Sequence, residues 1–286
     1  MEFSVVVPCY NHARYVRACL ASIDAQDVEG LEVIVIDDGS TDGSQGEIEG
    51  FGFSPRHAVK KLRTPNRGAH AALNHGLAQA TGRWVALCNS DDLFGPGRLA
   101  TLRAHCLETG ARFAFSKVWA LDADGADVTR SHPYAIELRE KQDAISTFPS
   151  VGWALVPTNV AISTGNFFFQ RSLFAEVGAF RPYRLVHDWD WVLRALLVTE
   201  PLYVPEALYG YRLHAENSFT GLLREVAARE CPELMRRYWK AASTSAPANK
   251  LAPSPAHWPG FCQSYLDELD YGPYLTGWEG IDAPFY

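Results

Sequence analysis

The chain has 286 residues, 47% of them apolar, which is enough for one large α/β domain or two modest ones with a real core. A net charge of -7 gives no basic footprint for nucleic acid, so a sugar, nucleotide or protein partner is expected instead. No apolar run approaches the roughly 18 residues of a membrane span, and the first residues do not resemble a signal peptide. The six cysteines form no C-x-x-C pair, which favours reduced thiols. We therefore expect a cytoplasmic protein, and peripheral contact with the inner face of a membrane stays open.

The N-terminal part alternates strand and helix patterns. Phe3–Pro8 and Leu31–Ile36 are apolar at nearly every position, as strands covered on both faces are, and a helical pattern separates them. A weaker strand is expected at His57–Arg63, then a helix over Arg67–Ala80 and a strand over Arg83–Cys88. This order predicts right-handed parallel crossovers in a doubly wound sheet flanked by helices.

The rest of the chain has a less regular pattern. After a helix begun by Pro96, the expected elements are a strand at Ala111–Leu121 with a turn at Asp122–Gly125, a strand at Phe167–Gln170, helices at Ser172–Val177 and Asp188–Leu197, a strand at Tyr203–Leu213 and a helix at Leu222–Lys240. Residues 131–158 lack periodicity and are expected to form an irregular region or lid. Residues 241–260, rich in Ala, Ser and Pro, are typical of a linker. The aromatic tail beyond them is too short to fold alone, so we expect it to dock on the main domain or on a partner.

Two acidic clusters follow two of the buried strands. Asp37-Asp38-Gly39-Ser40 comes after the second strand and Asn89-Ser90-Asp91-Asp92 after the fourth. Because ligands bind beyond the carboxyl ends of parallel strands, the two clusters predict one site. Each cluster could instead be a turn or a helix cap. A divalent cation, Mg²⁺ or Mn²⁺, on Asp92 would explain why two adjacent carboxylates are tolerated.

Other motifs leave alternatives open. Gly95–Ala100 satisfies the G-x-G-x-x-A dinucleotide pattern, but six residues separate it from its strand, and we do not favour it. No P-loop motif occurs. Asp188 and Asp190 could be acidic residues favoured at a helix start, or Asp188 could be a general base beside aromatic rings. His214 is either an ordinary histidine at a strand end or part of the site.

Taken together, several segments resemble family 2 inverting glycosyltransferases of the GT-A fold. They appear in the family's order between about residues 3 and 218: Val5–Asn11, Val35–Asp42, Asn66–Gly68, Leu73–Asn74, Ser90–Asp92, Gly165–Phe180 and His187–Asp188. Each motif is weak alone, whereas the ordered set is specific. The resemblance implies a GT-A domain over residues 1–220, with a donor half at 1–110 and an acceptor half at 111–220. Residues 221–286 then form a C-terminal helix, linker and tail without a match, through which a homo-oligomer could form.

The resemblance also implies roles for individual residues. The expected donor-nucleotide residues are Pro8, Tyr10, Asn11, Asp38, Arg67 and Asp91. Asp92 would be the direct ligand of the metal, Mn²⁺ or Mg²⁺, and His214 would touch the metal or the diphosphate. Asp188 would be the catalytic base, with His187 and Trp189 binding the acceptor. Two departures stand out, because Asn89 occupies a position often held by Asp, and His187 one held by Glu.

The implied reaction is an inverting transfer from a UDP- or dTDP-sugar to a hydroxyl of a glycan or lipid-linked acceptor, in surface polysaccharide or glycolipid assembly. A sugar-nucleotide pyrophosphorylase is disfavoured because the Gly-rich, basic loop after the first strand is missing. A non-catalytic module that binds a nucleotide-sugar or glycan remains an alternative, because of Asn89 and His187.

Overall fold

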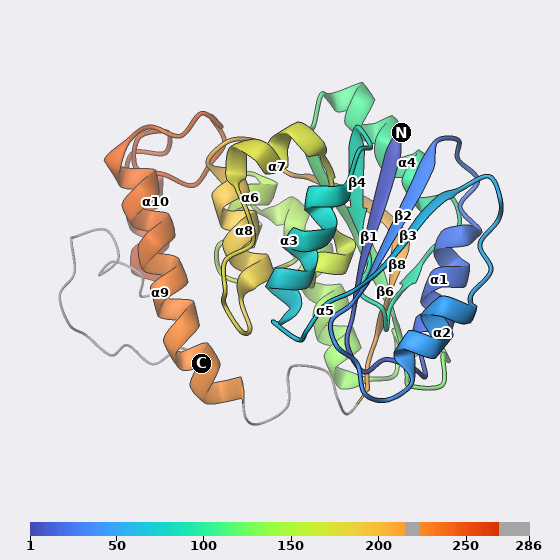
Figure 1. The fold of residues 1–286 in the computed structure, drawn as a ribbon. Helices are drawn as coiled ribbons and strands as arrows, with labels where there is room; N and C mark the ends of the chain where they lie inside the picture. The colour runs from blue at the N-terminus through green and yellow to red at the C-terminus, as the bar shows by residue number, and fades with distance from the viewer. Residues whose placement is uncertain (215–222, 269–286) are drawn as a thin grey trace.

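A single mixed sheet runs through the centre of the computed structural model, which describes residues 1–214 and 223–268 (Figure 1). Within these residues its order is β3-β2-β1-β4-β7-β6-β8-β5. The strands are β1 Phe3–Cys9, β2 Leu31–Asp37, β3 Ala58–Arg63, β4 Trp84–Leu87, β5 Leu93–Phe94, β6 Phe113–Leu121, β7 Phe168–Gln170 and β8 Leu202–Arg212. The first four strands are mutually parallel, as expected, whereas β7 is antiparallel to both of its neighbours. The carboxyl ends of β1, β2 and β4 therefore share one edge.

Helices cover both faces of the sheet (Figure 1). They are α1 Val16–Asp24, α2 Ser44–Gly50, α3 Ala69–Gln79, α4 Arg98–Thr109, α5 Pro133–Asp143, α6 Val151–Leu155, α7 Arg171–Val177, α8 His187–Leu196, α9 Leu223–Thr244 and α10 Phe261–Glu268, with 3₁₀ turns at Ala144–Thr147 and Thr164–Asn166. Side chains of β1 alternate between two cores, as a strand covered on both faces requires. Val6 packs in the core that contains α3 and α8, whereas Val5 and Val7 pack in the core that contains α1 and α4.

The expectation of an irregular region over residues 131–158 is wrong. This stretch forms α5, a 3₁₀ turn and α6. Helix α5 begins at Pro133 and buries a narrow stripe of Ala135, Leu138 and Gln142. The side chain of Gln142 accepts a hydrogen bond from Val118 N–H and donates one to the Val160 carbonyl. Because a polar residue occupies this core position, the apolar period of the helix is hidden in the sequence.

The expectation of a linker over residues 241–260 is also wrong. Helix α9 continues to Thr244, and the segment after it packs against the main domain. Ala252 and Ser254 are fully buried, and the Tyr238 hydroxyl donates a hydrogen bond to the Pro253 carbonyl. Small side chains are common in linkers, but here they let the chain approach the surface of the domain closely.

The start of the aromatic tail docks on the main domain, as expected. In α10 the rings of Phe261 and Tyr265 meet Trp153 edge to face, with centroids 5.0 and 4.8 Å apart. Residues 269–286 lie outside the described part of the chain. All six cysteines are free thiols.

None of the helices described is both long and apolar enough to traverse a bilayer.

Candidate active site

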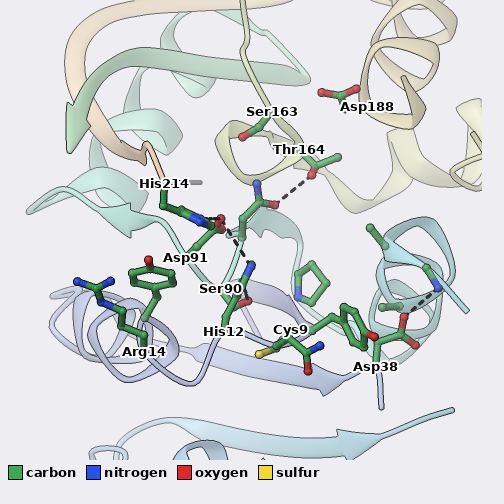
Figure 2. Close-up of a pocket in the computed structure, with 18 of the residues that line it drawn as sticks. Cys9, His12, Arg14, Asp38, Ser90, Asp91, Ser163, Thr164, Asp188 and His214 are labelled. Atoms are coloured by element: carbon green, nitrogen blue, oxygen red, sulfur yellow. Dashed lines mark hydrogen bonds and ion pairs between the residues drawn. The ribbon is translucent and has the colours of Figure 1, made fainter. Parts of the chain in front are cut away.

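A pocket of about 1020 Å³ opens at the sheet edge where both acidic clusters were expected to meet (Figure 2). Cys9 at the end of β1 is in register with Asp37 at the end of β2, and Asp38 N–H donates to the Cys9 carbonyl. The loop after β4, the turn at 162–164 and the start of α8 complete the walls. Residues of both acidic clusters, Asp38 and Asp91, therefore line one pocket, as the strand order predicts.

Asp38 holds one end of the pocket by accepting hydrogen bonds from two consecutive backbone amides. Arg67 N–H and Gly68 N–H donate to its carboxylate at 3.1 and 2.9 Å, and the Thr64 hydroxyl donates at 3.1 Å. Gly39 makes this turn possible, because its φ is +75° and a Cβ there would lie 2.8 Å from Asn66 N. Asp38 thus ties the loop after β2 to the loop before α3.

The end of β1 and the loop after it supply three of the expected donor-site residues, Pro8, Tyr10 and Asn11, which all line the pocket. Asn11 has a positive φ of 55°, and its side chain accepts a hydrogen bond from Thr41 N–H. Arg67 departs from the expectation. Its backbone amide serves Asp38, but its exposed side chain does not line the pocket.

Asp91 and Asp92 point to different places, and this corrects the expected metal ligand. Asp92 is 1% exposed and does not line the pocket, because Tyr209 Oη donates to its Oδ2 and Arg212 N–H donates to its Oδ1. Burial and the neighbouring charge of Asp91 raise the pKa of Asp92 well above its ordinary value. Asp91, by contrast, faces the pocket. Of these two carboxylates, Asp91 and not Asp92 is therefore placed to hold an ion in the pocket.

Two histidines converge on the Asp91 carboxylate (Figure 2). His214 Nε2 lies 3.0 Å from Asp91 Oδ2, and His12 Nε2 lies 3.8 Å from the same oxygen. Burial alone would raise the pKa of Asp91, but the hydrogen bond from His214 and the charge of His12 outweigh it and lower the pKa. One ligand atom from each of the three residues lies within 4.8 Å of the others. Nitrogen and carboxylate ligands at this spacing fit one divalent ion.

His12 is the functional candidate that the sequence interpretation missed. It follows β1 as Asp91 follows β4, and these two strands are neighbours in the sheet. Because His12 and Asp91 each follow one of two neighbouring parallel strands, their positions in the sequence could have indicated that they lie close together. Ser163 and Thr164 were missed as well, and Thr164 donates a hydrogen bond to Asn89 Oδ1 at 3.2 Å. Asn89 also lines the pocket, and this bond ties the loop after β4 to the turn at 162–164.

Asp188 lies across the pocket from Asp91, on the first turn of α8 (Figure 2). Its half-buried carboxylate accepts hydrogen bonds from Asn159 Nδ2 at 2.9 Å and from Trp189 N–H at 2.7 Å. No basic side chain is paired with it among the ion pairs of the described residues. Desolvation therefore dominates and raises the pKa of Asp188 to about 7. A carboxylate with this pKa is suited to accept a proton near neutral pH.

The two residues expected to bind an acceptor separate in the structure. His187 lines the pocket, and its buried Nδ1 has no hydrogen-bond partner within the described ranges. Burial lowers the pKa of His187 to about 4, so the ring is neutral at pH 7. Trp189 does not line the pocket, because its indole packs against the core and donates to the Leu155 carbonyl. The expectation that Trp189 contacts an acceptor is wrong for this reason.

A carboxylate from α9 holds the loop that leads into α8. Glu230 accepts hydrogen bonds from the backbone amides of Arg184, Leu185 and Val186, at 2.8, 2.9 and 3.2 Å. This loop ends one residue before His187. Helix α9 thereby holds the start of α8, and with it Asp188, in place beside the pocket.

The dinucleotide-like pattern at Gly95–Ala100 has a structural role. The Arg98 side chain within it is fully buried and donates hydrogen bonds to Ser116 and Asn166. Its guanidinium also lies 5.1 Å from the Tyr209 ring centroid. Through these contacts of Arg98 the segment packs beneath the pocket, and it does not form a nucleotide-binding loop.

Known proteins resemble this chain in sequence. The family model described as Glycosyl transferase family 2 matches residues 4–184. Glycosyltransferase GlyA of Streptococcus pneumoniae is 29% identical over 215 residues, which are 74% of this chain and 30% of that protein. An uncharacterized glycosyltransferase of Nostoc is 24% identical and shares 76% of this chain and 66% of its own length. The chain thus spans less than two thirds of these two relatives.

Solved structures share the fold. S. aureus TarS 1-349 in complex with UDP-GlcNAc superposes with a TM-score of 0.64 at 21% identity, over 85% of this chain and 66% of that one. The mannosyltransferase PcManGT from Pyrobaculum calidifontis, in complex with GDP-Man and Mn²⁺, gives a TM-score of 0.58 at 21% identity, over 84% of this chain and 64% of that one. At these identities the likeness shows the fold, which is the GT-A fold.

Proposed function

Because the chain belongs to Glycosyl transferase family 2, we propose that it transfers a sugar from a UDP- or dTDP-sugar to a hydroxyl of a glycan or lipid-linked acceptor. The observation that carries the proposal is one pocket with Asp38 at one end, Asp91 and His214 at the other, and Asp188 on the opposite wall. The named complexes of TarS with UDP-GlcNAc and of PcManGT with GDP-Man and Mn²⁺ support a nucleotide-sugar donor. We place the reaction in surface polysaccharide or glycolipid assembly, on the family resemblance.

The donor occupies the sheet edge in this proposal. Pro8, Tyr10, Asn11 and Asp38 receive the base and ribose, since they surround one end of the pocket. The diphosphate lies toward Asp91 and His214, which would hold Mn²⁺ or Mg²⁺. When bound, such an ion stabilises the negative charge that develops on the departing diphosphate.

Asp188 acts as the catalytic base. Its carboxylate takes the proton of the acceptor hydroxyl while that oxygen bonds to the anomeric carbon and the bond to the diphosphate breaks. Attack from the face opposite the diphosphate inverts the anomeric centre in one step, so no covalent enzyme intermediate forms. Asn159 and the Trp189 amide orient the carboxylate for this transfer.

The acceptor approaches beside His187 in this arrangement. The neutral ring lines the pocket, so it can contact an acceptor sugar without adding charge beside Asp188. Its neutrality also keeps the pKa of the base from falling. The replacement of an expected Glu by His187 is thus compatible with an active enzyme.

Two measurements test the proposal. The first is calorimetric titration of UDP and dTDP, with and without Mn²⁺, into the wild type and Asp91→Ala, and metal-dependent binding that the variant loses is expected. The second is slow hydrolysis of the matching nucleotide-sugar, which Asp188→Asn should lose while it still binds the nucleotide. Binding without hydrolysis or transfer in the wild type would favour the alternative, a non-catalytic binding module. Failure of both nucleotides to bind would remove the donor half of the proposal.

A further inference from the structure

We infer that His12 completes a two-histidine, one-carboxylate metal site with Asp91 and His214, and that this site selects Mn²⁺ and other first-row transition ions over Mg²⁺. The inference rests on the proposed function only in placing the ion at the donor diphosphate. The Nε2 atoms of both histidines face Asp91 Oδ2, at 3.0 Å from His214 and 3.8 Å from His12. The two rings meet edge to face, with centroids 5.9 Å apart.

His12 is held in place by its backbone before any ion binds. Its carbonyl accepts hydrogen bonds from Tyr15 N–H and Val16 N–H at the start of α1, and its own N–H donates to Ser44 Oγ at 2.9 Å. A ligand fixed by rigid elements loses little conformational entropy on binding a metal. The position of His12 therefore fits a ligand better than it fits a solvated loop histidine.

The ring of His12 is oriented as well. Its Nδ1 lies 2.7 Å from Ser90 Oγ. In the neutral tautomer with the proton on Nδ1, this contact is a hydrogen bond to Ser90 and the lone pair of Nε2 faces Asp91. A hydrogen bond of this kind on the second nitrogen is the usual support of a histidine that binds a metal.

The other two ligands are fixed in the same way. Arg212 Nε donates to the Asp91 carbonyl at 2.7 Å, and Leu213 N–H donates to the Leu121 carbonyl at 2.7 Å, one residue before His214. The three ligands thus come from three separate segments, each with its backbone bound to the sheet or to α1.

The chemistry of this donor set determines which ion it prefers. Imidazole nitrogen suits the later first-row ions such as Zn²⁺, Fe²⁺ and Ni²⁺ best, and Mn²⁺ stands at the weak end of that series. Mg²⁺ demands oxygen ligands and gives up its water reluctantly, so two imidazoles disfavour it more than they disfavour Mn²⁺. With Asn89 neutral and Asp92 turned away, Asp91 is the one carboxylate of the set. A divalent ion there keeps a net positive charge and open coordination positions, both of which favour a diphosphate.

The test compares the wild type with His12→Ala and His12→Gln, and uses His105→Gln as the matched control. His105 lies on α4, where it contacts Glu206, and it does not line the pocket. Mn²⁺ binding with and without UDP is measured by calorimetry, and Mg²⁺ by its competition with Mn²⁺. Pulsed electron paramagnetic resonance of bound Mn²⁺ detects coupling to imidazole ¹⁴N and counts the histidine ligands. Thermal unfolding confirms that each variant is folded.

We expect His12→Ala to weaken Mn²⁺ binding about tenfold or more and to change Mg²⁺ binding much less, so that the preference for Mn²⁺ falls. The spectrum should fall from two coordinated imidazoles to one in both His12 variants and stay unchanged in His105→Gln. Unchanged Mn²⁺ affinity and an unchanged ¹⁴N signal in both His12 variants would overturn the inference. Failure of the wild type to bind Mn²⁺ while it still binds UDP would also overturn it, yet would leave the donor site intact. Failure of UDP to bind with or without metal would count against the proposed function itself.

Discussion

The hydroxyl of Tyr209 on β8 donates a hydrogen bond of 2.5 Å to Oδ2 of Asp92, which follows β4. Arg212 N–H donates to the other carboxylate oxygen at 2.8 Å. Through these two hydrogen bonds, Asp92 joins the loop that carries Asp91 to strand β8, which leads to His214. The two adjacent carboxylates thus have different roles. Asp92 supports the structure, whereas Asp91 faces the pocket.

Substitution of the two aspartates should separate these duties. Asp92→Ala leaves two buried donors without partners and should lower the free energy of unfolding by about 2 to 4 kcal/mol. Asp91→Ala should change stability little and abolish metal-dependent UDP binding. Urea unfolding and calorimetry on both variants measure the two effects. A stable Asp92→Ala protein that has lost metal binding would contradict this division.

The pH dependence of catalysis should follow Asp188. Since its pKa is about 7, the ionised base becomes scarcer below that pH, and kcat/KM should fall about tenfold per pH unit there. Above pH 7 the base is ionised and the rate should level off. Because the pKa of His187 is about 4, its ring stays neutral near pH 7 and should add no second inflection to the pH–rate profile. Rates measured between about pH 5.5 and 8.5 check the profile, and a flat profile would exclude Asp188 as the base.

The same carboxylate should reduce stability at high pH. Its pKa in the folded chain, about 7, exceeds the ordinary value of 3.8, so the folded state keeps a proton that the unfolded state releases between these values. Stability from this group therefore falls as pH rises through that window. Asp188→Asn should be more stable than the wild type by about 1 to 2 kcal/mol at pH 8, since water screens the exposed part of the carboxylate, and equal to it at pH 4. Denaturant titrations at both pH values measure the difference, and equal stability at pH 8 would refute it.

Gly165 should be intolerant of any side chain. A Cβ on it would lie 1.8 Å from Tyr209 Oη and 2.7 Å from Asn89 N. Gly165→Ala must therefore displace Tyr209 and break its bond to Asp92, at a cost of about 1 to 3 kcal/mol or more. Gly46→Ala in α2 is the control, because nothing lies within 4 Å of its Cβ, and it should stabilise the chain slightly. Thermal unfolding compares the pair, and an undisturbed Gly165→Ala protein would show that Tyr209 can move freely.

Glu230 should act as a positioning residue for Asp188. Glu230→Ala removes the acceptor of three loop amides, so kcat should fall by about tenfold or more while UDP affinity stays within about twofold. Glu225→Ala, on the exposed face of the same helix, is the matched control. Steady-state kinetics measures the change in kcat, and UDP titration measures the change in UDP affinity. Parallel losses of kcat and UDP affinity would instead indicate general unfolding.

That Asp38 and Asp91 line one pocket was predictable from the sequence, because the strand order determines where their loops lie. Asp38 follows β2 and Asp91 follows β4, and both strands pair in parallel with β1, so their carboxyl ends share one edge of the sheet. The choice between Asp91 and Asp92 was not predictable, because it depends on Tyr209, more than a hundred residues away. The wrong expectations for residues 131–158 and 241–260 have a related cause. Gln142 and Ala252 are buried by contacts with distant segments, which the local sequence does not reveal.

The bracing of the loop before α8 by Glu230 has a consequence for how such chains can diverge. The family model ends at residue 184, whereas Asp188, the proposed base, and Glu230 lie beyond it. Substitutions in α9 can therefore retune the rate of transfer, or the acceptors that reach the base, without altering any residue at the donor end. In the proposed mechanism, the residues that receive the donor nucleotide, from Pro8 to Asp91, lie within the family match, whereas the base and its positioning residue lie beyond it.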